Sequence, residues 1–179
     1  MSSYSGAVFV VGGSGVTFAL SAVQDLVRGG ADSHVKIIDI VWCIQDPGTS
    51  HFSLPTAILT PPSTASLSPL VTQLASIVER GTSVRVRVQV FYTRAISTRF
   101  DGMILPRGIT LLPGRPKFDK LLDAAVADTL SAGGTSGVFV GACGPVALAK
   151  AAVGAVGGVD ARMRASVGGV DFHEETFGW

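Results

Sequence analysis

A glycine-rich turn near the start of the chain is the first segment whose composition suggests chemistry. Gly12-Gly13-Ser14-Gly15 follows an apolar run at 7–11, and residues 17–28 then show apolar positions at a helical period. Glycines at such a turn let a pyrophosphate approach backbone N–H groups, and the helix N-terminus favours its negative charge. A tight packing turn without a ligand is the alternative. The dinucleotide fingerprint is incomplete, because Phe18 stands where its third glycine would be and no acid follows at the usual distance.

A second turn, Ala142-Cys143-Gly144-Pro145, follows an apolar run at 137–142. It falls at a strand's carboxyl end, where open α/β sheets bind ligands. The alternative is structural: a small buried residue, a turn and a helix start. No His or Asp lies close in sequence to activate Cys143, so we do not expect a nucleophile.

Strands and helices alternate along the chain around these turns. Apolar runs predict further strands at 35–44 and 84–92, and helical periods predict helices at 67–80, 117–131 and 145–156. The run at 84–92 alternates strictly, which predicts a strand exposed on one face. Shorter strands are expected at 103–105, near 110–112 and at 166–172, and the stretch 46–68 is predicted to be a loop. The pattern predicts one α/β domain over 1–179, a Rossmann-like open parallel sheet with helices on both faces.

Composition excludes several classes of protein. The 179 residues are 47% hydrophobic and 15% charged, with a net charge of +1. No run reaches the roughly 18 apolar residues of a membrane helix, and there is no basic field. We therefore expect neither direct membrane insertion nor nucleic-acid binding. Cys43 and Cys143 suggest reduced thiols rather than a disulfide scaffold. His34, His51 and His173 have no partners that would make them metal ligands, so we expect no metal site.

The end of the chain, Phe172-His173-Glu174-Glu175-Thr176-Phe177-Gly178-Trp179, is unusual. Chain ends usually fray, so a terminal indole suggests an end that docks on a flat partner. In this order, the glycine-rich turn, the Cys-Gly-Pro turn and this tail resemble the nicotinamide-dinucleotide half of the ferredoxin-NADP reductase superfamily. Within it, the motifs look most like those of fungal ferric reductases and their NADPH oxidase relatives.

The resemblance implies roles for particular residues. Cys143 would lie beside the nicotinamide C4 and orient it for hydride transfer. Trp179 would stack on the flavin and yield its place to the nicotinamide. Glu175 would position the carboxamide or relay a proton, although a solvated acidic turn is equally consistent with the sequence. The implied dinucleotide contacts are Gly12, Gly13, Ser14, Gly15, Thr17, Gln45, Arg94, Arg115, Gly144 and Pro145.

Gln45 is a departure from that family. Trp42-Cys43-Ile44-Gln45-Asp46 is similar to the family's Trp-x-x-Arg-Asp, in which the arginine helps hold the adenosine 2′-phosphate. Glutamine can hydrogen-bond a phosphate but cannot neutralise it. The sequence therefore predicts weaker discrimination between NADPH and NADH, unless Arg94 or Arg115 compensates. Either arginine could equally be a solvated loop residue.

The resemblance implies part of an oxidoreductase. NADP(H) would bind here and pass hydride to FAD in a flavin-binding domain in cis, with onward electron transfer through haem to ferric iron. Flavin-binding and haem-bearing membrane domains would precede this region, at the cytosolic face of a membrane, and the isolated chain should be inactive. The alternative is a stand-alone nucleotide-binding or regulatory module without redox activity. A short-chain dehydrogenase is disfavoured, because neither Tyr4 nor Tyr92 is followed by Lys at the Tyr-x-x-x-Lys spacing.

Overall fold

The computed structural model of the chain describes residues 3–29, 34–45, 69–80, 84–93 and 105–175. These ranges form a six-stranded, all-parallel open sheet in the order β4-β3-β2-β1-β5-β6. The strands are β1 (Gly6–Gly12), β2 (Ile37–Ile44), β3 (Arg85–Tyr92), β4 (Ile109–Pro113), β5 (Val138–Cys143) and β6 (Val170–Glu175). The predicted α/β class with a parallel, Rossmann-like sheet is confirmed.

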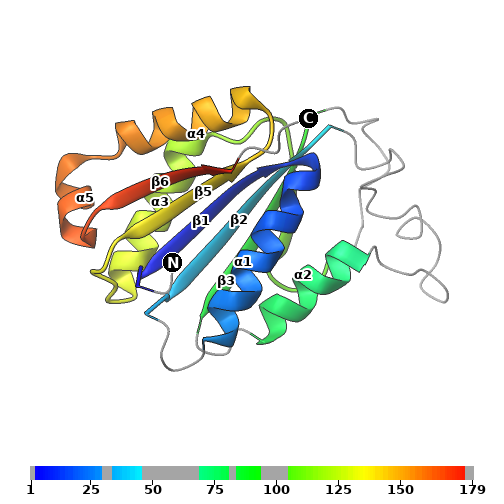
Figure 1. The fold of residues 1–179 in the computed structure, drawn as a ribbon, viewed down its shortest axis with the longest axis horizontal. Coiled ribbons are helices and arrows are strands. Elements are labelled where there is room, and N and C mark those ends of the chain that lie inside the picture. The colour runs from blue at the N-terminus through cyan, green and yellow to red at the C-terminus, as the bar shows by residue number, and fades with distance from the viewer. Residues whose placement is uncertain (1–2, 30–33, 46–68, 81–83, 94–104, 176–179) are drawn as a thin grey trace.

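Helices cover both faces of this sheet (Figure 1). One face packs against α1 (Val16–Arg28) and α2 (Pro69–Arg80), and the other against α3 (Phe118–Ser131), α4 (Val146–Gly158) and α5 (Ala161–Val167). Within β1, Phe9 and Val11 join the core beside α1, whereas Val8 and Val10 join the core beside α3 and α4. A strand buried on both faces needs continuous apolar sequence, which explains the runs in β1 and β2. Within the described ranges, no helix is both long and apolar enough to cross a bilayer.

The strand order reverses between β1 and β5. From β1 the chain builds β2, β3 and β4 outward on one side, and then returns to add β5 and β6 on the other. The turns after β1 and β5 therefore meet at the carboxyl edge of the sheet. In open α/β sheets this reversal is where the ligand crevice lies.

The end of the fold differs from the prediction. A strand is predicted at 166–172, but α5 extends to Val167 and β6 begins only at Val170. The carboxylate of Asp160 accepts hydrogen bonds from the N–H groups of Arg162 (2.9 Å) and Met163 (3.1 Å), and this cap starts α5. Gly168, at φ 89°, ends it in the left-handed conformation. β6 consequently continues to Glu175.

Three other predicted elements can be compared with the structure. The strand predicted near 110–112 is confirmed as β4. Of the strand predicted at 103–105, Leu105 lies outside any strand, and 103–104 lie outside the described residues. Pro145 precedes α4 as its N-cap residue, and the helix continues to Gly158 through the Gly- and Ala-rich stretch.

The polar face of β3 is less exposed than its alternating sequence predicts. Arg87 donates two hydrogen bonds of 2.6 Å to the two carboxylate oxygens of Asp39 on β2. The same guanidinium lies 2.6 Å from Asp128 on α3, which also pairs with Arg85 at 3.1 Å. The hydrogen bond to Asp39 raises the pKa of Arg87 further above its usual value, although burial opposes the shift. This network ties α3 to the two neighbouring strands.

Candidate functional site

The turns after β1 and β5 pack directly against each other. A β-carbon added at Gly15 would collide with the carbonyl oxygen of Cys143. One added at Gly144 would lie 2.9 Å from the amide nitrogen of Gly12, and one at Gly12 would lie 2.8 Å from the ring of Pro145. These glycines are therefore required by the close approach of the two turns. The packing explanation of the glycine-rich turn accounts for them without a ligand.

Gly13 has a different reason to be glycine. Its φ is 53°, in the left-handed region, and an added β-carbon would meet no atom of the described residues within 4 Å. Ser14 beside it is exposed. The short 3₁₀ helix η1 (Gly13–Gly15) and α1 have no side-chain N-cap and no acidic residue in their first turns. An anion could therefore approach N–H groups here without displacing a side chain.

Trp42 holds this turn in place from the neighbouring strand. Its indole Nε1 donates a 3.0 Å hydrogen bond to the carbonyl oxygen of Gly13, and the side chain is only 1% exposed. Within the turn, the hydroxyl of Thr17 donates to the carbonyl oxygen of Ser14 at 3.0 Å. Trp42 belongs to the segment that resembles Trp-x-x-Arg-Asp, but no role was predicted for it from the sequence. The one sign of such a role in the sequence is a single indole in a mostly aliphatic strand.

Cys143 and Glu175 are brought side by side by the parallel pairing of β5 and β6. Cys143 is fully buried. Burial, and secondly the negative charge of Glu175, raise the pKa of the Cys143 thiol. The thiol is therefore protonated at neutral pH and is a poor nucleophile, which fits an orienting role better than covalent chemistry. Trp179, the third residue predicted at this end of the site, lies outside the described residues.

A cavity of about 300 Å³ lies at the carboxyl ends of β2, β3 and β4. Backbone hydrogen bonds align these ends: Thr93 N–H donates to Ile44 C=O (3.2 Å), and Gly114 N–H donates to Tyr92 C=O (2.8 Å). The described residues that line the cavity are Gln45, Thr93, Gly114 and Arg115. Two predicted contacts that are distant in sequence, Gln45 and Arg115, thus share one cavity. Arg94, the other predicted basic contact, lies outside the described residues.

The site elements follow one another along the carboxyl edge of the sheet. The cavity lies at β4 to β2, the open turn at β1, and the Cys143–Glu175 pair at β5 and β6. No protein-family model matches the chain, and no curated protein sequence matches it. The order of the site elements is therefore the observation on which a functional interpretation depends.

Proposed function

We propose that the chain is the NADP(H)-binding domain of a ferric reductase-type flavoprotein of the ferredoxin-NADP reductase superfamily. The supporting observation is the order of three features along one sheet edge: a cavity with a basic residue, a turn with uncapped N–H groups, and a buried thiol beside a carboxylate. This order matches the adenosine, pyrophosphate and nicotinamide parts of an extended dinucleotide. Four strand spacings separate β3 from β6, which is about 20 Å at roughly 4.8 Å each and is within reach of such a ligand.

The described residues fit the chemistry of each part of NADP(H). Arg115 and Gln45 would contact the adenosine end, where a guanidinium can pair with phosphate and an amide can hydrogen-bond it. The N–H groups at Gly13 and Ser14, where no side chain caps the turn, would hold the pyrophosphate. Cys143 and Glu175 would orient the nicotinamide, with the thiol supplying a neutral contact and the carboxylate a hydrogen-bond acceptor.

The parent protein in this proposal is a membrane oxidoreductase, with this domain at the cytosolic face. Bound NADPH would supply a hydride from its nicotinamide C4 to FAD on a flavin-binding domain in cis, and electrons would continue through haem to ferric iron. This chain holds neither FAD nor haem in the proposal; it binds and orients the nucleotide. Trp179 is proposed to cover the place where nicotinamide and flavin meet. The isolated chain should bind nucleotide and show no turnover.

The substitution Ser14→Asp tests the placement of the pyrophosphate. Ser14 is exposed, and a carboxylate at a helix N-terminus is favourable for the fold. The same charge beside a pyrophosphate is repulsive, so the affinity for NADP⁺ should fall about tenfold or more by calorimetric titration. This change is cleaner than a side chain at Gly13, which the positive φ would strain.

Ser21→Asp is the matched control, because Ser21 is exposed farther along α1. It adds the same charge to the same helix away from the turn and should leave the affinity nearly unchanged. If wild-type protein does not bind NADP⁺, the proposed function is wrong. If Ser14→Asp binds as tightly as wild type, the pyrophosphate does not lie at this turn.

A further inference from the structure

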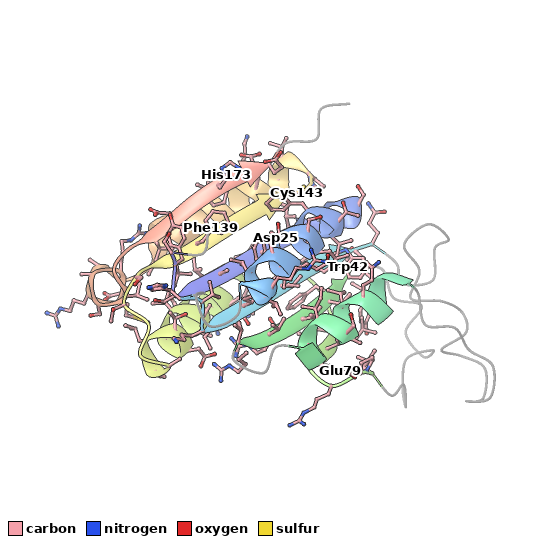
Figure 2. The ribbon with its side chains drawn as sticks, turned by 60° about the horizontal axis from the view of Figure 1, so that its bottom comes forward. Asp25, Trp42, Glu79, Phe139, Cys143 and His173 are labelled. Carbon is pink, nitrogen blue, oxygen red and sulfur yellow. The ribbon has the colours of Figure 1, made fainter. Side chains whose placement is uncertain are left out.

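A row of polar groups lies along β6, on the face that looks toward α1. Asp171, His173 and Glu175 share this face, because the alternate residues Val170 and Phe172 pack into the core on the other side. Figure 2 shows His173 and Cys143 on the neighbouring strands β6 and β5, beside α1. The row runs along the strand to the Cys143–Glu175 pair, where the nicotinamide is proposed to bind.

The imidazole of His173 packs on the aromatic ring of Phe139 from the neighbouring strand β5. Its ring stacks on Phe139, with centroids 6.4 Å apart and planes inclined at 28°. The β5 residue opposite His173 is Gly141, where an added β-carbon would lie 3.0 Å from the Phe139 ring and 3.3 Å from the Phe18 ring. Among the described residues, the hydrogen-bond partner of the imidazole is Glu175, whose Oε2 lies 3.2 Å from Nε2. The contact with Phe139 thus holds His173 next to Glu175, the carboxylate that pairs in register with Cys143.

The other described ionisable groups on this face of β5 and β6 are Cys143, Asp171 and Glu175, and Tyr4 contacts Asp171. Tyr4 donates a 2.7 Å hydrogen bond to Asp171, and this bond, with burial and the charge of Asp171, raises the pKa of the Tyr4 hydroxyl. The Cys143 thiol is likewise kept protonated. The charged residues of α1, Asp25 and Arg28, lie in its last turn, away from the site. Histidine is the side-chain type used most often as a switch of charge between pH 5 and 8, and His173 is the histidine that the described residues place on this face.

We propose that His173 is a positioning residue that acts through Glu175 and sets the preference of the nicotinamide site between the oxidised and reduced rings. The inference depends on the proposed function. With a neutral imidazole, the Glu175 carboxylate is available to face the positively charged oxidised ring. With a protonated imidazole, the carboxylate is paired and its charge is offset, so the oxidised nucleotide binds less tightly. The reduced ring is neutral, so the affinity for the reduced nucleotide depends less on the charge of Glu175. A lower pH therefore favours release of the oxidised product.

The experiment compares the affinities of NADP⁺ and NADPH for this chain between pH 5.5 and 8.5. The two ligands differ only in the nicotinamide, so the titration of their phosphates cancels in the ratio of dissociation constants. The preference for NADP⁺ should rise about threefold to fivefold with increasing pH, as expected for one charge acting near a solvated surface. His173→Gln should keep the high-pH ratio throughout, and His173→Arg should keep the low-pH ratio. His34→Gln, an exposed histidine before β2, is the matched control and should behave as wild type.

A second measurement tests the pairing without nucleotide. In NMR spectra at fixed pH, Glu175→Gln should shift the ring resonances of His173, because it replaces the carboxylate that lies 3.2 Å from Nε2. Unchanged resonances would contradict the pairing. If no nucleotide binds at any pH, both the proposed function and this inference are wrong. If NADP⁺ and NADPH bind but their affinity ratio is the same at every pH, or if His173→Gln and His173→Arg give the same pH-dependent ratio as wild type, only the inference about His173 is overturned.

Discussion

Replacing Trp42 with phenylalanine should loosen the glycine-rich turn while the sheet stays intact. The substitution removes the 3.0 Å hydrogen bond from the indole to the Gly13 carbonyl oxygen. Such a bond contributes about 1 kcal/mol net. Trp42 is 1% exposed, so the smaller ring also leaves part of a buried space empty, which costs about 1–2 kcal/mol more. We expect Trp42→Phe to lower the free energy of unfolding by about 2–3 kcal/mol.

The same change should weaken NADP⁺ binding about fivefold. The roughly 1 kcal/mol that the indole supplies to order the turn must then come from the binding energy. Unfolding in urea is best followed by circular dichroism, because the substitution removes one of only two tryptophans. Affinity is measured by calorimetry on the folded protein.

Ile38→Ala is the matched control for a general loss of stability. Ile38 is fully buried in the same strand, on the same face as Trp42, but toward its amino end. Its truncation should cost about 2–5 kcal/mol and leave the affinity for NADP⁺ unchanged. If both variants lose the same affinity for NADP⁺, the weaker binding of Trp42→Phe results only from its lower stability. If Trp42→Phe is destabilised but binds normally, the indole does not order the turn for binding.

The remaining predictions concern nucleotide selectivity and the ion network. Gln45→Arg should raise the affinity for NADPH about threefold to tenfold and leave that for NADH unchanged, because a charge-assisted contact is gained in a solvated cavity. An unchanged ratio would show that Arg94 or Arg115 already supplies the selectivity. Arg87→Met should cost about 2–3 kcal/mol of stability in urea, below the range for fully buried pairs because the side chains of Arg87 and Asp39 are 37% and 12% exposed. Adding Asp39→Asn should recover part of the loss, and strictly additive losses would contradict the coupling.

Several features of this protein are determined locally, and the sequence was enough to predict them. The strand before Gly12, the helix after it and the strand that ends at Cys143 follow from hydrophobic periodicity and glycine placement, which act over a few residues. The parallel class follows from the alternation of strands and helices. The β6 boundary is also set locally, by a cap at Asp160 and a left-handed glycine at Gly168. These two signals were present in the sequence but were overlooked, so this boundary was predicted wrongly.

Other features depend on contacts between distant parts of the chain, so only the tertiary structure could decide them. Strand register places Glu175 beside Cys143, and the sheet order brings Gln45 and Arg115 to one cavity. The structure also separates two kinds of glycine in one motif: Gly15 is required by the backbone of the neighbouring turn, whereas Gly13 needs its positive φ and has no described residue against its α-carbon. The sequence shows the same residue type at both positions. The difference arises because strand pairing brings a second turn against Gly15, whereas none of the described residues packs against Gly13.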